Sequence, residues 1–513
     1  MFKKSPTTKQ LDLFNSPVNL LCDRESSLYT DEHSWHNRFY KNVTSKIDED
    51  IFRPLFKESR EDKKDGRPTT SIRVLVAMCI LKEGCGCSDE SLYEQCRFNL
   101  LFRSALGLFN LKDQCPCINS YYTFRRRICD YEEQTGTNLF DKCFSQITRS
   151  QAKEYRVSGK SIRMDSKLIS SNIAWYSRYE IIQRTFVREV SETEIAGIED
   201  QMLRTQAIQF FNDDAEKTVY RTDAPGMNEK LLHLGLVIDY ILSHAPEDSK
   251  SLLRRVFDEQ YIKGKDGTVS VRDKKLISAD SVQNPNDPTA TYRKKGKQTV
   301  KGYSVNITET TDGKDSPDLI VDAQVKSASA ADSSFLKDAV NKAAEITGEQ
   351  VEKAHVDGAY QSKQNRELAA RENEGFDLVA NGIQGKPSRF DLNLNEDGTL
   401  SITDRKKEEV VNGIPVNDHK WKIKIVNKEG KEYWRYFTKE DAESSKARRE
   451  VDSVPIEERN KRNNVEATIF QYCYHTRNNK TRYRGKIKHA LQALARCAWI
   501  NARRLYLFDL KMA

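Results

Sequence analysis

SIRMDSKLISS, at residues 161–171, is the stretch that decides how this chain folds. Its apolar residues lie on both sides of one acidic residue, Asp165, and they predict a strand that carries a carboxylate in its interior. A charge inside a strand is costly unless it is paired or bound to a metal ion. The alternative is an ordinary edge-strand charge. Asp165 is therefore the first candidate for a functional carboxylate.

The segments that follow predict the rest of a sheet. GYSVNITET (302–310) and DLIVDAQVKSA (318–328) alternate as neighbouring strands do. FLKDAVNKAAEITG (335–348) predicts a helix that ends at Gly348, before a short strand in VEKAHVDGAYQS (351–362). A second helix over 361–375 and a strand over 376–382 follow. The order from Asp165 is strand, helical insertion, strand, strand, helix, strand, helix, strand, which indicates an α/β fold.

Two more carboxylates join Asp165 as candidates. Asp357 ends the short strand directly before Gly358, although a turn cap is the plainer reading. Glu466 lies in RNNVEATIFQ, whose apolar stripe predicts a helix, and a solvated helix glutamate is the alternative there. Two or three carboxylates supply the oxygen ligands that Mg²⁺ or Mn²⁺ requires. Cations around Glu466 and in the 477–488 tract would hold phosphates.

The remaining sequence divides into three unlike parts. Residues 1–150 predict a helical N-terminal domain, with a Gly-Arg-Pro turn at 66–68 and helices capped by Ser88 and Asn119. Residues 155–513 predict one catalytic core. This core is interrupted by a polar helical insertion at 176–280 and a β-rich insertion at 385–450.

Composition narrows the class of protein. The chain has 513 residues, with 84 Lys and Arg against 76 Asp and Glu, a net charge of +8. No apolar run approaches the ~20 residues that a membrane-spanning helix needs, which excludes a multi-span membrane protein. The N-terminal segment lacks an apolar signal region, so we expect a cytoplasmic protein. The net charge is an average over unlike parts, since basic residues concentrate at 293–301 and 477–488.

Eleven cysteines, nine of them in the first 150 residues, fit a reducing compartment better than a disulfide framework. The Cys85-x-Cys87 and Cys115-x-Cys117 pairs lack the usual zinc-ligand spacing. Buried free thiols are therefore favoured over a structural zinc site.

Several motifs in the same order resemble the DDE transposases of bacterial insertion sequences, in the group with a β-rich insertion before the catalytic Glu. The first-Asp, second-Asp and Glu blocks of that family are similar to RMDSKLISSNIA, HVDGAYQSKQN and RNNVEATIFQYCYHTRNNKTRYRGK. The basic turn and the third strand are similar to NPNDPTATYRKKGKQTVKGYSVNIT and VDAQVKSASAADSSFL. The preceding helical domain is similar to GRPTTSIRVLVAMCILKEGCGCSDESLYEQCRFNLLFRSALGL and NSYYTFRRRI.

The resemblance implies a ribonuclease-H-like fold in which Asp165, Asp357 and Glu466 meet at one end of the sheet and bind two Mg²⁺ or Mn²⁺ ions. The implied reaction is in-line phosphoryl transfer, with cleavage at the element ends and strand transfer into target DNA. Implied partners are the terminal inverted repeats, target DNA and a second subunit in a DNA-bound homodimer, without any membrane and in association with the nucleoid. A related nuclease without strand transfer and an inactive DNA-binding relic are the alternatives.

Some relatives carry Tyr-x2-Arg-x3-Glu-x6-Lys around the Glu. Arg462 matches the arginine, while Arg459 and Cys473 stand at the tyrosine and lysine positions. A basic residue of the following loop is the candidate to replace that lysine. The full set of predicted DNA contacts is Arg125, Arg126, Arg127, Arg293, Lys294, Lys295, Lys297, Arg462, Lys480, Arg482 and Arg484. For the aromatic residues Trp421, Trp434 and Tyr436 of the β-rich insertion, core packing is favoured over base stacking.

Overall fold

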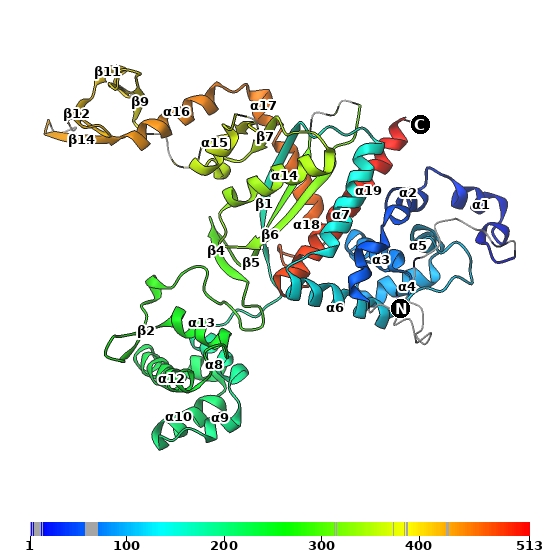
Figure 1. The fold of residues 1–513 in the computed structure, drawn as a ribbon, viewed down its shortest axis with the longest axis horizontal. Coiled ribbons are helices and arrows are strands. Elements are labelled where there is room, and N and C mark those ends of the chain that lie inside the picture. The colour runs from blue at the N-terminus through cyan, green and yellow to red at the C-terminus, as the bar shows by residue number, and fades with distance from the viewer. Residues whose placement is uncertain are drawn as a thin grey trace.

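The computed structural model describes residues 2, 4, 12, 14–56, 70–311, 313, 315–372, 374–383, 385, 388–426 and 430–512. The centre of this described part is a six-stranded mixed sheet (Figure 1). Its strands are β1 (Ser161–Ser170), β4 (Thr291–Lys295), β5 (Gln298–Thr310), β6 (Ile320–Ser327), β7 (Lys353–Val356) and β8 (Asp377–Ala380). β5 pairs antiparallel with β1 on one side and with β4 and β6 on the other. β7 and β8 continue the sheet beyond β1 as parallel strands.

Most of the predicted order of elements is confirmed. The strand expected at 161–171 is β1, and the two alternating segments that follow the helical insertion are the antiparallel neighbours β5 and β6. The first predicted helix is α14 (Leu336–Thr347), which ends at Gly348 in the left-handed conformation. The second, α15 (Lys363–Ala369), is shorter than expected. It stops at Ala369 because the Phe376 N–H bonds to the Ala369 carbonyl and turns the chain into β8.

The two faces of the sheet have different partners. Ile162 and Met164 of β1 are buried in a cluster that includes Phe335 and Leu336 at the start of α14. The opposite face packs on α17 (Ile456–Asn460), α18 (Asn463–Cys473) and α19 (Lys486–Met512), together with α7 (Leu139–Glu154) of the N-terminal part. Because side chains alternate along a strand, the odd-numbered residues of β1, Asp165 among them, point toward the α18 side.

The N-terminal helices stand beside α19 (Figure 1). They are α1 (Asp23–Thr30), α2 (Trp35–Asn42), α3 (Ile72–Cys85), α4 (Asp89–Phe98), α5 (Leu100–Leu106), α6 (Ile118–Thr135) and α7 (Leu139–Glu154). Ser88 caps α4 as predicted, by accepting from the Ser91 N–H. The predicted cap at Asn119 is wrong, because the N-cap of α6 is Cys117 and Asn119 lies within the first turn of the helix. The predicted turn at 66–68 lies outside the described residues.

Two insertions project from the sheet (Figure 1). The helical insertion has its own hydrophobic core and consists of α8 (Arg178–Glu189), α9 (Glu192–Ala196), α10 (Gln201–Phe211), α11 (Ala215–Arg221), α12 (Ala224–His244), α13 (Ser251–Gln260), β2 (Tyr261–Lys263) and β3 (Val269–Val271). The β-rich insertion consists of β9 (Phe390–Leu394), β10 (Leu400–Asp404), β11 (Glu409–Asn412), β12 (Ile414–Asn417), β13 (Lys420–Val426), β14 (Glu432–Thr438) and the following α16 (Lys439–Ser453).

The aromatic residues of the β-rich insertion separate into two groups. Trp421 is buried in the core of the insertion, as predicted. The same prediction is wrong for Trp434 and Tyr436, which are 43% and 48% exposed. The difference follows from strand alternation, because Phe437 of β14 faces the core and its neighbours at 434 and 436 alternate with the inward positions.

No helix in the described part of the chain is both long and apolar enough to cross a bilayer.

Candidate active site

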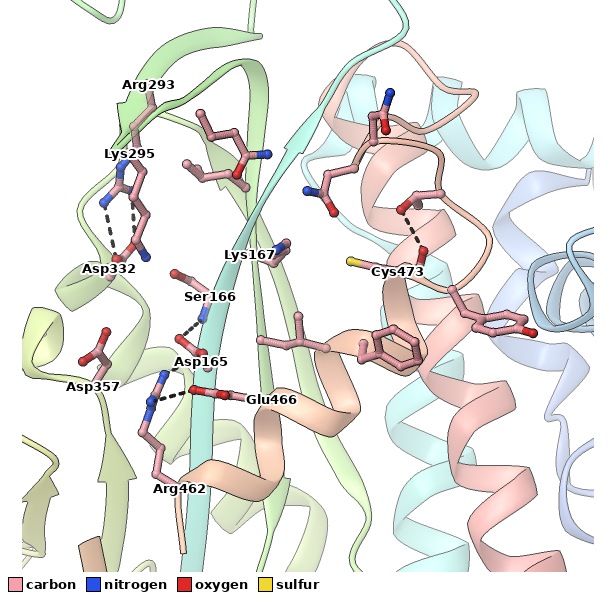
Figure 2. Close-up of a pocket in the computed structure, with 18 residues that line it drawn as sticks. Asp165, Ser166, Lys167, Arg293, Lys295, Asp332, Asp357, Arg462, Glu466 and Cys473 are labelled. Carbon is pink, nitrogen blue, oxygen red and sulfur yellow. Dashed lines mark hydrogen bonds and ion pairs between the residues drawn. The ribbon is translucent and has the colours of Figure 1, made fainter. Parts of the chain in front are cut away.

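Asp165 and Asp357 lie level with each other on neighbouring strands. β1 and β7 are parallel, and the last register pair joins Arg163 to His355. Asp165 lies two residues after Arg163, and Asp357 lies two residues after His355. The pairing of the two strands therefore brings both aspartates to the same level, at the carboxyl end of β7. Figure 2 shows the two side chains facing the same cleft. Asp357 keeps one oxygen toward the Gly358 N–H at 2.7 Å, which fixes the turn after β7.

Asp165 is held by two donors. The Ser166 N–H donates to its Oδ1 at 2.8 Å, and Arg462 donates from Nη2 to its Oδ2 at 2.7 Å. Burial raises the pKa of the Asp165 carboxyl, and the nearby Asp357 acts in the same direction, while Arg462 opposes both. Asp165 is therefore an acid whose charge depends on cations placed beside it.

Arg462 also connects Asp165 to Glu466. Arg462 and Glu466 belong to the same segment, one helical turn apart at the start of α18. Arg462 Nη1 lies 3.2 Å from Glu466 Oε1 (Figure 2). The Arg462 side chain is only 10% exposed, whereas the Glu466 side chain is 63% exposed. A mostly buried guanidinium thus joins a strand carboxylate to an exposed helix carboxylate at the edge of the cleft.

One cleft of about 840 Å³ collects six of the residues predicted from the sequence. They are Asp165, Asp357, Glu466, Arg293, Lys295 and Arg462. Lys167 adds a further cation to the lining. Arg293, like Arg462, is paired with a carboxylate, because it lies 3.1 Å from Asp332 (Figure 2). Residues that are hundreds of positions apart in the chain therefore share one acidic and basic cavity.

The other predicted cations are distributed around this cleft. Lys294 and Lys297 are exposed near the β4–β5 turn. Lys480 is exposed in a loop that runs beside the end of β1, where the Ser170 N–H bonds to the Asn479 carbonyl at 2.8 Å. Arg482 donates to the Cys87 and Gly86 carbonyls, and Arg484 to the Asn172 carbonyl. The last two arginines thus connect parts of the protein to one another.

The three consecutive arginines of α6 do not share one environment. Arg126 and Arg127 are exposed. Arg125 differs from the expectation of a DNA contact, because its side chain is 16% exposed and pairs with Asp89 at 3.3 Å. Its guanidinium also lies 5.4 Å from the centre of the Tyr483 ring. The Arg125 charge therefore stabilises the contact between α6 and the loop that carries Lys480.

Asp287 is a residue that the sequence analysis did not select. It is 1% exposed and accepts hydrogen bonds from Ser171 Oγ and Tyr303 OH, each at 2.5 Å, and from the Gly485 N–H at 2.9 Å. These donors belong to the end of β1, to β5 and to the basic loop before α19. The signal in the sequence was a single acidic residue beside the basic 293–301 cluster. Asp287 positions the basic loop against the sheet.

We expect Asp287→Asn to lower the free energy of unfolding by about 1–3 kcal/mol, because at least one buried donor loses its acceptor. The same change should increase tryptic cleavage within 477–484, since the loop loses its link to the sheet. Urea denaturation and limited proteolysis measure the two effects. Asp266→Asn, in a fully exposed turn, is the matched control. Equal behaviour of the two variants would contradict the positioning role of Asp287.

The three carboxylates of the cleft suit a divalent metal ion, since carboxylate oxygens are the hard ligands that Mg²⁺ and Mn²⁺ prefer. Their arrangement is not closed around an ion. Within the described ranges, no group of three or more His, Cys, Asp or Glu side chains is assembled that could hold a metal. Arg462 lies between Asp165 and Glu466 instead.

Comparison with known families bears on the N-terminal part. Residues 28–127 match the family model described as a transposase domain (DUF772). The match begins in α1 and ends within α6, at Arg127. No curated protein and no solved structure matches the chain. The match supports a transposase family and a role in transposition.

Proposed function

We propose that the protein is a DDE-type DNA transposase of a bacterial insertion sequence, which cleaves DNA at the element ends and transfers the strands into target DNA. The observation that carries this proposal is the cleft shared by Asp165, Asp357, Glu466, Arg462 and Lys295. Phosphoryl transfer needs acidic groups for metal binding beside cations for phosphates, and this cleft offers both. The transposase-domain match at residues 28–127 supports the same conclusion.

The topology of the sheet supports a ribonuclease-H-like core. The strand order is β6-β5-β1-β7-β8, with β4 beside β6 at the same edge of β5. The first three strands are antiparallel, and β7 and β8 are parallel to β1. The resemblance to DDE transposases implies two aspartates and a glutamate that meet at one end of the sheet, and the shared cleft of Asp165, Asp357 and Glu466 supports this proposal.

The side chains of the cleft have separate roles in this proposal. Asp165, Asp357 and Glu466 would hold two Mg²⁺ or Mn²⁺ ions. Bound ions would supply activation of the attacking oxygen and stabilisation of the leaving oxygen in an in-line displacement. Lys295 and Lys167 would bind the phosphates that flank the reacting one, and Arg462 would orient Asp165 and Glu466.

DNA outside the cleft would contact exposed cations. Arg126 and Arg127 on α6, Lys294 and Lys297 near the β4–β5 turn, and Lys480 in the basic loop are available for phosphates. We propose that the α6 arginines bind the terminal inverted repeat. Transposition brings two element ends together, so we propose a homodimer in the DNA-bound complex, acting at the nucleoid in the cytoplasm.

The test uses purified protein and labelled duplexes that end in the inverted repeats flanking the coding sequence. We expect nicks at the repeat ends and covalent joining to an unlabelled plasmid, both dependent on Mg²⁺ or Mn²⁺ and abolished by a chelator. Cleavage without joining would favour a nuclease. Binding of the ends without cleavage in either metal would favour an inactive DNA-binding relic.

A further inference from the structure

Two large aromatic side chains of α18 and its C-terminal end stand in solvent within the cleft. Phe470 is 68% exposed and Tyr474 is 67% exposed, and both belong to the lining that contains Asp165, Asp357 and Glu466. The packing face of the helix is already occupied, because Val465 and Tyr472 are 0% and 1% exposed. Burial of an exposed aromatic ring is favourable, so a ligand that covers these rings gains affinity.

Their spacing aligns these rings with Glu466. Residues four apart lie on the same side of a helix, so Glu466, Phe470 and Tyr474 form one stripe. Each step along this stripe rises about 6 Å, which places the aromatic residues beyond Glu466 along the wall of the cleft. The two ring centres are 6.3 Å apart and the ring planes are inclined by 72°. The pair forms an angled apolar surface farther along the wall of the cleft that holds the proposed reacting centre.

The residues around Phe470 and Tyr474 favour an anionic ligand that also has flat apolar groups. Lys167 and Lys295 line the same cleft, so an anionic ligand is favoured there over an apolar surface of another protein. Nucleobases stack favourably on aromatic rings, largely independently of sequence. Inside an intact duplex, the faces of each base are covered by its neighbours. Only a base that is unpaired or displaced from the stack can therefore use these rings.

We propose that Phe470 and Tyr474 form a stacking platform for unpaired bases of the DNA strand that lies in the cleft. This inference rests on the proposed function and adds a ligand to the same site. The platform would hold a frayed or displaced end of the strand, while Asp165, Asp357 and Glu466 face its phosphate. The protein would consequently prefer DNA ends with a single-stranded extension over blunt ends.

The experiment uses a short duplex with a single-stranded overhang that carries 2-aminopurine, a base whose fluorescence is quenched by stacking. A blunt duplex with the same base in a paired interior position is the second probe. Binding is measured in Ca²⁺, to prevent cleavage. For the wild-type protein we expect quenching of the overhang base and tighter binding of the overhang duplex. Phe470→Leu/Tyr474→Leu should abolish this quenching and lower affinity for the overhang duplex by about tenfold or more, without changing blunt-duplex binding.

Matched variants separate stacking from folding and from association. Phe470→Tyr/Tyr474→Phe keeps both rings and should retain the quenching. Tyr220→Leu removes a 91% exposed ring from the helical insertion and should change nothing. The platform is overturned if the double leucine variant, folded by circular dichroism, still quenches and binds like the wild type. It is also overturned if that variant alters only dimerisation in sedimentation. A wild-type protein that binds neither probe would instead contradict the proposed function.

Discussion

Asp357→Asn is expected to slow DNA strand cleavage by at least about a thousandfold, which corresponds to ~4 kcal/mol of lost transition-state stabilisation. The substitution removes the charge while it preserves the size of the side chain. The amide oxygen can still accept from the Gly358 N–H, the hydrogen bond that now fixes the turn after β7. We therefore expect little change in the free energy of unfolding, and a loss of activity that cannot be ascribed to unfolding.

Single-turnover cleavage of end-bearing duplex, with thermal denaturation of the same sample, measures both quantities. Asp165→Asn and Glu466→Gln should share the loss of activity, because all three carboxylates line the same cleft. Asp338→Asn is the matched control, since that carboxylate is 63% exposed on α14, outside the cleft. If the Asp357 variant cleaved at the wild-type rate, the chemistry would have to be assigned to another part of the protein.

Local periodicity explains which elements could be predicted from the sequence. Apolar and polar residues alternate over 303–308 of β5 and 321–326 of β6, and α14 carries its apolar residues at helical spacing up to Gly348. In β1, apolar residues lie on both sides of Asp165. The proximity of Asp165 and Asp357 depends on something else, the parallel pairing of β1 with β7. That register is a long-range property of the sheet, so the sequence supplied the candidates and the family resemblance supplied their grouping.

The roles of individual cations could not be predicted, for a physical reason. Arg125, Arg126 and Arg127 are consecutive residues of the same type, yet only Arg125 points toward Asp89 and the Tyr483 ring. A helix turns about 100° per residue, so neighbouring side chains meet entirely different surroundings. The same holds for Asp287, whose donors Ser171, Tyr303 and Gly485 belong to segments that only tertiary packing brings together. Composition identifies a basic stretch, and packing decides which of its charges remain available.

Glu309→Ala is expected to lower the free energy of unfolding by about 3–5 kcal/mol, the cost of leaving buried charges without their partner. Glu309 is fully buried on β5 and pairs with Arg163 at 2.6 Å and with Arg504 at 2.7 Å. It also accepts from Thr468 Oγ1 at 2.7 Å. Thr468 follows Glu466 by two residues in α18, so this network also fixes the helix that carries the third carboxylate. Urea denaturation at neutral pH measures the loss.

The contribution of Glu309 to the free energy of unfolding should depend on pH. Burial raises the pKa of Glu309, but Arg504 and Arg163 outweigh it and bring the pKa below the ordinary value of 4.5. A carboxylate with a depressed pKa stabilises the folded state above its unfolded pKa and loses that contribution as pH falls through the folded value. The difference between wild type and Glu309→Ala should thus be constant above about pH 5 and shrink in more acidic solution.

Two variants distinguish the lost charge from lost packing in the Glu309 experiment. Glu309→Gln keeps hydrogen-bonding capacity and nearly the same volume, so its loss should be smaller than that of alanine but should still disappear at low pH. Glu345→Ala breaks an exposed ion pair with Arg149, and we expect about 0–1 kcal/mol from it at any pH. If Glu309→Ala resembled Glu345→Ala, the buried network would not hold α18. Reduced strand cleavage by Glu309→Gln under conditions where it is fully folded would show that the network also positions Glu466.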